Sequence, residues 1–223
     1  MLWIPAAFRH VRQLERQQPM FLVGRYLSPF VRRVGVSLNE LGLPFERKIL
    51  STVSDRAAIE AYNPLARVPA LILDDGEALI DSAAILDYLD ELAGPAKALT
   101  PAKGPERRRV QKIVAIALGT IEKAVGAAYE INRRPAEKVH QPWLDQLLAQ
   151  TAGGLAALEA ALAGSWYVGN RLTQADITVA VGHGFIARSQ PTVLPPGRYK
   201  KLDQLTTRLE ATASFKAAQP ETV

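Results

Sequence analysis

The hydrophobic pattern of the chain changes character near residue 100. Before that point, short apolar runs alternate with segments whose apolar residues recur every three or four positions, which predicts strands and helices in turn. The predicted elements are a strand at about 21–24, a helix at 29–41, a strand at 45–50 and a short helix begun by Ser54-Asp55. They continue with strands at 70–73 and 78–80 and a helix from Asp81 onward. This order fits a small mixed sheet with helices packed on it.

Beyond residue 100 no strand signal of comparable strength follows. A segment rich in helix breakers, with Gly94-Pro95 and Thr100-Pro101, separates the two parts. The later segments with helical spacing are 105–132, 142–163, 173–189 and 199–211. The sequence therefore predicts an α/β domain over 20–96, a linker over 97–104 and an all-helical domain over 105–223.

Residues 1–19 form an N-terminal extension to this pattern. Their apolar residues precede the arginines, whereas the positive charges of a secretory signal come first. One interpretation is a weak amphipathic presequence. We favour a simple extension, or an upstream start codon with Met20 as the true beginning, and the sequence alone leaves open whether residues 1–19 belong to the native protein.

Composition narrows the classes of function. Apolar residues make up 48% of the chain, which is enough for a sizeable core. No apolar run approaches the roughly 18 residues that span a bilayer. The absence of cysteine excludes a disulfide scaffold and a protein thiol nucleophile. The histidines are too widely separated to suggest a metal site, so we expect no bound metal.

The charge is distributed unevenly. Residues 20–98 carry 8 Lys and Arg against 11 Asp and Glu, whereas residues 99–223 carry 16 against 10. This change of sign supports a domain boundary near residue 98. The basic residues of the second part are interspersed with acids and accompanied by few aromatic residues, so we expect no binding of nucleic acid.

The segment between the first strand and the first helix has the features of an anion site. Ser28 is placed to cap the helix, and Pro29 suits its first turn. The unpaired N–H groups and the dipole at a helix N-terminus favour an anion. A strand, X-Pro-aromatic-X and a helix in this order resemble the start of thioredoxin-like domains, with Ser28 and Val31 in the places of the redox cysteines. A dithiol cycle is excluded, but the Ser28 hydroxyl can donate a hydrogen bond to a thiolate from another molecule.

Four motifs together resemble the cytosolic glutathione S-transferases, with a serine in the N-terminal motif as in bacterial members. They are Ser28-Pro29-Phe30-Val31-Arg32-Arg33, Asn63-Pro64 with Arg67-Val68-Pro69-Ala70-Leu71, Asp81-Ser82-Ala83-Ala84-Ile85, and Leu172-Thr173-Gln174-Ala175-Asp176-Ile177. Each is weak alone, but their order and spacing are specific, and the resemblance covers about residues 20–215. It implies a thioredoxin-like βαβαββα domain followed by an all-helical domain.

The resemblance also implies how glutathione would bind. Pro69 would form a cis peptide bond, which turns the N–H and C=O of Val68 toward the cysteinyl part of the peptide. Asp81 would hold the γ-glutamyl ammonium group. Ser82 and the helix N-terminus behind it would hold the adjacent carboxylate. Arg67 would face the glycyl carboxylate.

Simpler structural roles compete with these assignments. Ser28 can be only a helix cap, and the pair Asp81-Ser82 can be one too. Tyr26 could replace Ser28 as the partner of the thiolate, since some classes use tyrosine, but the alignment through Pro29 favours Ser28.

Other polar residues of the second part are interpreted as structural. We predict that His183 and Tyr129 are core residues of their helices. Thr173 and Asp176 have the spacing of a capping box that starts a buried helix.

With Ser28 as the catalytic residue, the resemblance implies an enzyme of detoxification. It would be a glutathione S-transferase that uses glutathione as co-substrate and conjugates its thiolate to an apolar electrophile, whose identity the sequence does not give. The resemblance further implies a cytoplasmic homodimer without a membrane or nucleic-acid partner. A glutathione-dependent isomerase, peroxidase or disulfide reductase on the same site, or a non-catalytic binding or regulatory protein, would share every motif.

Overall fold

The N-terminal part of the chain is built on one four-stranded sheet. The computed structural model describes residues 20–221, so the predicted extension at 1–19 lies outside the described residues. The strand order is β2-β1-β3-β4, with β1 parallel to β2 and β3 antiparallel to both β1 and β4. The strands are β1 (Phe21–Val23), β2 (Glu46–Lys48), β3 (Ala70–Ile72) and β4 (Ala78–Ile80). This sheet confirms the thioredoxin-like domain that the resemblance implies.

Helix α1 (Pro29–Leu41) begins and ends at the residues that the sequence predicts. The Val31 N–H donates to the Ser28 Oγ at 3.4 Å, and Pro29 is the first helical residue. Gly42 ends the helix with a φ of 68°, the left-handed conformation that glycine adopts readily. Strand β1 therefore leads by a short loop into the helix whose N-terminus carries Ser28.

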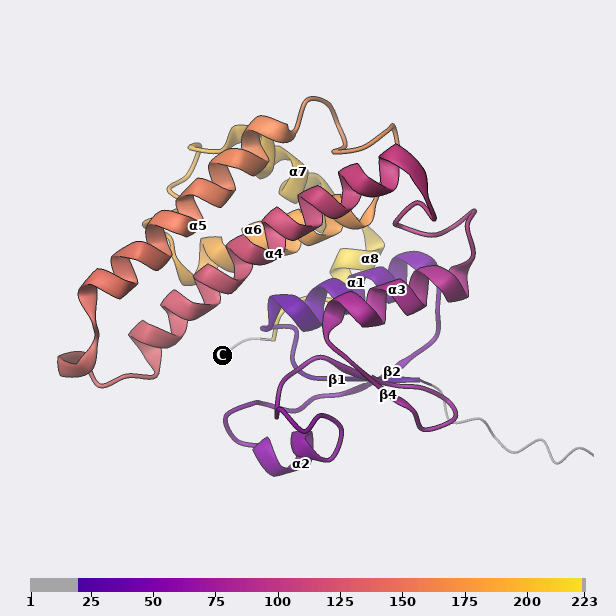
Figure 1. Ribbon diagram of the computed structural model, residues 1–223, viewed down its shortest axis with the longest axis horizontal. Helices are drawn as coiled ribbons and strands as arrows, with labels where there is room; N and C mark the ends of the chain where they lie inside the picture. The colour runs from indigo at the N-terminus through magenta and orange to yellow at the C-terminus, as the bar shows by residue number, and fades with distance from the viewer. Residues whose placement is uncertain (1–19, 222–223) are drawn as a thin grey trace, which may run out of the picture.

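Two layers of helix flank the sheet. Helices α1 and α3 (Ser82–Ala93) cover one face, and the short helix α2 (Arg56–Glu60) lies on the other side (Figure 1). Asp55 precedes α2 as predicted, but its carboxylate accepts hydrogen bonds from the Ser51 N–H and the Ser54 hydroxyl, and makes no cap bond to the helix.

Every regular element after α3 in the described part of the chain is helical. The elements are α4 (Gly104–Asn132), a 3-10 helix (Ala136–Lys138), α5 (Gln141–Ala161), α6 (Gln174–Ser189), α7 (Lys200–Glu210) and α8 (Ala213–Lys216). The four long helices confirm the predicted segments. Helix α8 was not predicted, because a single turn is too short for hydrophobic periodicity to indicate.

Helix α6 begins at a buried capping box. The Asp176 carboxylate accepts hydrogen bonds from the Thr173 N–H at 2.9 Å, the Thr173 hydroxyl at 2.7 Å and the Tyr167 N–H at 3.0 Å. Burial raises the pKa of Asp176, and these hydrogen bonds act in the opposite direction. The capping box confirms the prediction, and His183 further along the helix is buried, as expected of a core residue.

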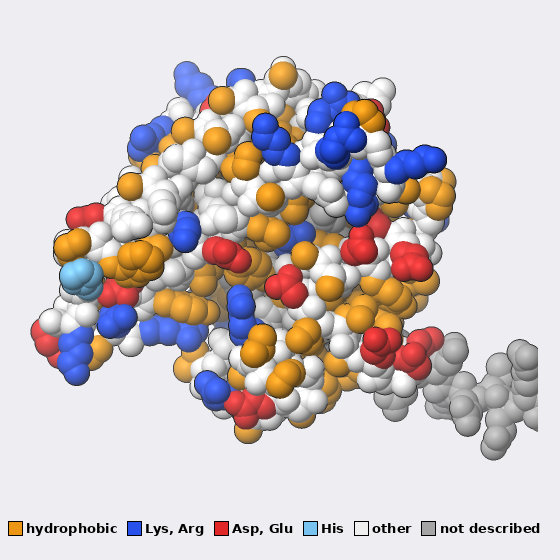
Figure 2. All heavy atoms as spheres, in the orientation of Figure 1, with side chains coloured by type: hydrophobic (Ala, Val, Ile, Leu, Met, Phe, Trp, Pro, Cys, Tyr) orange, Lys and Arg blue, Asp and Glu red, His pale blue; other side chains and the backbone are white. Residues whose placement is uncertain are grey.

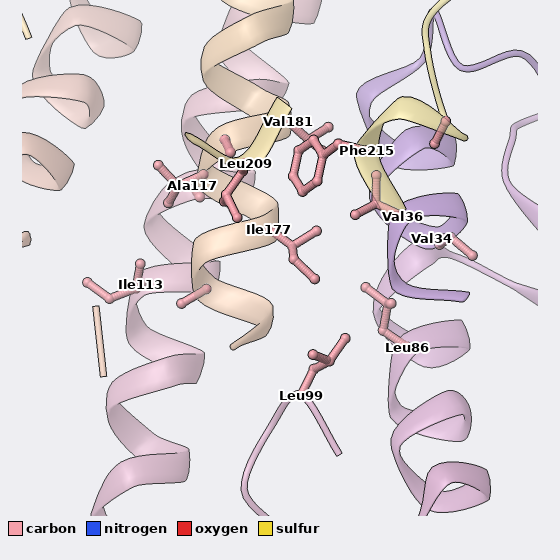
Figure 3. Close-up of a cluster of buried hydrophobic side chains, with 14 of the residues drawn as sticks. Val34, Val36, Leu86, Leu99, Ile113, Ala117, Ile177, Val181, Leu209 and Phe215 are labelled. Atoms are coloured by element: carbon pink, nitrogen blue, oxygen red, sulfur yellow. The ribbon is translucent and has the colours of Figure 1, made fainter. Parts of the chain in front are cut away.

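One hydrophobic core joins the two parts of the molecule. Val34 of α1 and Leu86 of α3 belong to the same buried cluster as Ile177 of α6 and Phe215 of α8. Figure 3 shows these side chains between the helices of the two parts, with Leu99 of the connecting segment close by. Their shared burial ties the position of α1 to that of the helical part. Among residues 20–221, no helix combines the length and apolar character needed to cross a membrane.

Candidate functional site

The first turn of α1 presents the hydroxyl of Ser28 beside a groove. The Ser28 N–H donates to the Arg25 C=O at 3.0 Å, which closes the loop in front of the helix. The bond from the Val31 N–H to Ser28 Oγ is long at 3.4 Å, and the side chain is only half-buried. Within residues 20–221 the hydroxyl acts as an acceptor and not as a donor. The Ser28 oxygen can therefore cap the helix while its O–H donates a hydrogen bond to a ligand.

Gly24 allows the loop before β3 to approach the start of α1. It follows β1 with a φ of 124°, and a Cβ at this position would lie 2.7 Å from Val31 Cγ2 and 2.9 Å from Val68 Cβ. The Val68–Pro69 peptide bond is cis, as predicted. Neither the N–H nor the C=O of Val68 has a backbone partner within residues 20–221. The Val68 backbone is therefore free to pair with a peptide next to Ser28.

Asp81 and Ser82 form the N-terminus of α3. Asp81 has a φ of 68°, and its Oδ1 accepts a hydrogen bond from the Ala83 N–H at 2.8 Å, so the residue does cap the helix. The Asp81 side chain is exposed, whereas Ser82 is buried as the first helical residue. The cap uses one carboxylate oxygen, which leaves Asp81 Oδ2 available for a ligand.

Two adjoining hollows bring the predicted residues together. The smaller, of about 80 Å³, is lined by Arg67, Val68, Pro69, Asp81 and Ser82, among others. The larger, of about 560 Å³, is lined by Ser28 and again by Arg67 and Val68. Arg67 and Val68 line both hollows, so the two hollows together form one groove. Every predicted site residue lines this groove. Figure 2 shows the surface hollowed between the projecting ends of α4 and α5 and the part of the sheet domain around α2.

Both parts of the chain match models of one family. Residues 22–97 match the "Glutathione S-transferase, N-terminal domain", and residues 141–210 match the "Glutathione S-transferase, C-terminal domain". The "Uncharacterized GST-like protein YibF" of Escherichia coli is 33% identical over 170 residues, which is 75% of this chain and 82% of that protein. The chain belongs to the glutathione S-transferase family.

Two further relatives carry different names within this family. "Probable maleylacetoacetate isomerase 1" of Drosophila melanogaster is 30% identical over 231 residues, which covers 99% of this chain and 87% of that protein. A glutathione transferase family member from Pseudomonas fluorescens Pf-5, solved with bound glutathione, is 32% identical in sequence with a TM-score of 0.82. The match covers 91% of this chain and 100% of that one. Glutathione is bound in that solved relative, and the Drosophila relative is named a probable isomerase.

In this transferase-family fold, α4 supplies a wall of the groove that the sequence analysis missed. Its lining residues recur at spacings of three and four, at Leu118, Glu122, Val125, Tyr129 and Asn132. The prediction that Tyr129 is a core residue was wrong, because its side chain is 45% exposed and lines the larger hollow. The periodicity shows that these residues share a face, but a second apolar face of α4 packs into the helical domain, and spacing alone does not tell the two apart.

Tyr26 is buried away from the groove. Its side chain is 1% exposed, and a Cβ on Gly35 would lie 2.6 Å from the Tyr26 Oη, so the ring packs against the backbone of α1. The Arg47 guanidinium carbon lies 3.6 Å from the centre of the ring. Burial raises the pKa of Tyr26, while Arg47 acts in the opposite direction. Tyr26 lines neither hollow, so this geometry favours Ser28 over Tyr26 as the group that faces a ligand.

Helix α1 contains a buried cation within electrostatic range of Asp81, which lines the smaller hollow. Arg33 of α1 is 1% exposed, and its Nε and Nη1 have no hydrogen-bond partner within residues 20–221. Burial lowers the pKa of Arg33 to about 10, and the negative charge of Asp81 acts in the opposite direction. Arg33 therefore stays charged at neutral pH, and its positive charge favours a bound anion at this end of the groove.

The described residues do not suggest a metal centre. Among residues 20–221, no three His, Cys, Asp or Glu side chains are grouped so that they could hold a metal ion. The chemical groups of the site are hydroxyls, two helix N-termini, a free peptide edge, the carboxylates of Asp81 and Glu122 and several arginines, which suit a peptide with charged ends.

Proposed function

We propose that this protein is a glutathione transferase that joins the sulfur of glutathione to an electrophilic carbon. The observation that carries the proposal is the arrangement of the N-termini of α1 and α3 around hollows that share Val68. One helix N-terminus offers Ser28 for a thiolate, and the other offers Asp81 and Ser82 for the charged end of a peptide.

Glutathione would lie along the groove in an extended form. Its γ-glutamyl ammonium group would bind Asp81, and the adjacent carboxylate would bind Ser82 and the N–H groups of α3. The cysteinyl unit would pair with the backbone of Val68. The glycyl carboxylate would face Arg67, which lines both hollows.

The reaction would begin with the loss of the thiol proton to solvent. The Ser28 hydroxyl would donate a hydrogen bond to the resulting thiolate, and the N-terminus of α1 would add a favourable potential. The thiolate sulfur would then attack the electrophilic carbon and form the new S–C bond. The electron pair of the broken bond would depart with the leaving group.

A glutathione-dependent isomerase is the second candidate, favoured by the 30% identity to the Drosophila protein over 99% of the chain. In that reaction the thiolate would add to a conjugated double bond, rotation would occur about the resulting single bond, and elimination would release the thiolate again. The transferase consumes glutathione, whereas the isomerase returns it. Measuring free thiol during turnover separates the two.

The proposal includes the assembly and location that the resemblance implies. We expect a cytoplasmic homodimer with the glutathione-binding domain at 20–96 and the helical domain at 105–223. Analytical ultracentrifugation tests the dimer.

The direct test measures binding and turnover separately. Calorimetric titration with glutathione reports binding, and 1-chloro-2,4-dinitrobenzene reports conjugation through the absorbance of its glutathione adduct. Asp81→Ala should weaken glutathione binding by roughly ten- to a hundred-fold, the scale of a hydrogen bond between charged groups. Asp87→Ala is the matched control, because Asp87 lies on the same helix with its side chain 76% exposed. Binding without turnover of any electrophile would leave a non-catalytic glutathione-binding protein, and equal affinity in both variants would remove Asp81 from the site.

A further inference from the structure

The larger hollow has an uneven charge. Four arginines line it, Arg25, Arg56, Arg67 and Arg133, and none of its lining residues within 20–221 is acidic. Figure 2 shows Lys and Arg side chains, with some Asp and Glu among them, at the end of the helical projection that borders the hollow. A concave surface with charges of one sign attracts ligands of the opposite sign more strongly than a flat one does.

Two of these arginines have a counter-charge already. The Arg56 Nε lies 2.9 Å from Glu60 Oε1, one helical turn away. Arg67 faces the glycyl carboxylate in the proposed function. Glutathione brings no other unbalanced carboxylate, because its γ-glutamyl ammonium and carboxylate groups neutralise each other. Its thiolate is a further negative charge, which Ser28 and the N-terminus of α1 hold in the proposed function. Arg25 and Arg133 are therefore left without a carboxylate partner after glutathione is bound.

The acid closest in sequence to Arg133 is engaged elsewhere. Glu130 accepts a hydrogen bond from Arg134 Nε at 2.8 Å and another from the His140 N–H at 3.0 Å. Both of its carboxylate oxygens are thus occupied on the side of α4 away from the groove. Arg133 instead stacks on Tyr129, with its guanidinium carbon 3.8 Å from the centre of the ring.

The acid that reaches the loop of Arg25 is also engaged. Glu221 accepts a hydrogen bond from the Leu27 N–H at 3.1 Å and pairs with Arg47 Nη2 at 2.5 Å. Arg25 has no ion pair with another of the residues 20–221. It lies three residues before Ser28, on the loop from which the thiolate would be approached.

One part of the wall of the hollow, on α4 and α6, is apolar. Val125, Ala128 and Phe185 line it, and Tyr129 presents a ring beside them. This surface suits the carbon skeleton of a second substrate. The skeleton would lie between Arg25 on the loop before α1 and Arg133 at the C-terminal end of α4, where a charged substituent would meet an unpaired cation.

We propose that the second substrate carries a carboxylate group and that Arg25 and Arg133 select it. The inference rests on the proposed function, and it revises the expectation of a purely apolar electrophile to that of an apolar body with an acidic substituent. A neutral compound of the same shape would leave both cations in the hollow without a partner.

The test compares two conjugates that differ only in charge. S-(4-carboxybenzyl)glutathione and its amide, S-(4-carbamoylbenzyl)glutathione, place an acid or a neutral group of similar size beyond the sulfur. Their dissociation constants are measured by calorimetry for the wild type, Arg25→Gln, Arg133→Gln and the double variant. Arg109→Gln is the control, because Arg109 is an exposed residue of α4 outside both hollows.

We expect the wild type and Arg109→Gln to bind the acid roughly ten-fold or more tightly than the amide. The preference should shrink in each single variant and vanish in the double variant, while the affinity for the amide changes little. Equal binding of the two conjugates by the wild type, a preference that survives in the double variant, or binding of neither conjugate would overturn the inference. The preference for the acid without any conjugation activity would instead refute the transferase proposal and leave the acidic specificity in place.

Discussion

Arg32 of α1 and Glu210 of α7 form a two-pronged ion pair, in which both nitrogen–oxygen distances are 2.7 Å. The Arg32 Nε also donates to the Ala218 C=O at 2.9 Å. The Arg32 side chain is 1% exposed, whereas that of Glu210 is 29% exposed. The pair joins α1, the helix that Ser28 caps, to the end of α7 in the helical domain, and it satisfies a charge that could not otherwise be buried.

Removal of the carboxylate from this pair should destabilise the protein. Glu210→Ala would leave the buried Arg32 without its counter-charge, so we expect the free energy of unfolding to fall by about 2–4 kcal/mol. Glu60→Ala is the control, since it breaks an exposed pair with Arg56 and should change stability by no more than about 0.5 kcal/mol. Urea unfolding measures both. Equal losses in the two variants would mean that the buried pair contributes no more than a surface pair.

The two members of the capping box at the start of α6 should differ in their effect on stability. Thr173→Ala removes one donor, with an expected loss of about 0.5–2 kcal/mol. Asp176→Ala leaves three donors without their acceptor, on Thr173 and Tyr167, and should lose about 3 kcal/mol or more. Thermal unfolding provides the measurement. Glutathione affinity should hardly change, and a selective loss of binding in an equally stable Thr173→Ala protein would contradict a purely structural role.

His183 should make the stability depend on pH. Its Nε2 lies 3.1 Å from Asp203 Oδ1, yet burial, the largest influence, lowers its pKa, with Asp203 and Glu159 acting in the opposite direction. An unfolded histidine titrates near about 6.5. Below that pH the unfolded chain binds a proton that the folded protein does not. The free energy of unfolding should therefore decrease as the pH is lowered from about 6.5, until the pKa of His183 in the folded protein is reached.

The check is to compare urea unfolding across this pH range in two variants. His183→Gln should flatten the slope of stability against pH just below about 6.5. His140→Gln is the control, because His140 is exposed. A slope in His183→Gln identical to that of the wild type would show that His183 is not the group responsible.

Local signals explain why α1 could be predicted to the residue. The Ser28 cap, Pro29 at the first position and Gly42 at the end are all properties of a few neighbouring residues. The burial of Arg32 was not predictable in the same way. Its partner Glu210 is 178 positions away, and a helical arginine is usually solvated.

The residues of the groove were likewise predictable only where a local motif marks them. Ser28, Val68 and Asp81 were identified because the family motifs mark them, and the structure places all three along one groove. Arg133 and Tyr129 lie in a helix without such a motif. Whether their side of α4 faces the core or the groove depends on how the two domains pack, which is a long-range property that hydrophobic periodicity does not contain.

The proposed role of Ser28 can be expressed as a change in the pKa of bound glutathione. A free thiol titrates near about 8.5, so only a few per cent is thiolate at neutral pH. A hydroxyl hydrogen bond to the thiolate contributes about 1.5–3 kcal/mol, and the N-terminus of α1 adds about 0.3–1 kcal/mol. Together they would lower the thiol pKa by about 1.5–3 units, at 1.36 kcal/mol per unit.

Ser28→Ala should therefore raise the pKa of the bound thiol by about 1–2 units and slow conjugation at neutral pH by roughly ten- to a hundred-fold. Glutathione affinity should change less, because the contacts of Val68 and Asp81 remain. The measurements are the thiolate absorbance of the complex against pH and the rate with 1-chloro-2,4-dinitrobenzene. Ser54→Ala is the control, since Ser54 is exposed and lines neither hollow. The same thiol pKa and rate in Ser28→Ala as in the wild type would reduce Ser28 to a helix cap and leave the backbone N–H groups of α1 as the partners of the thiolate.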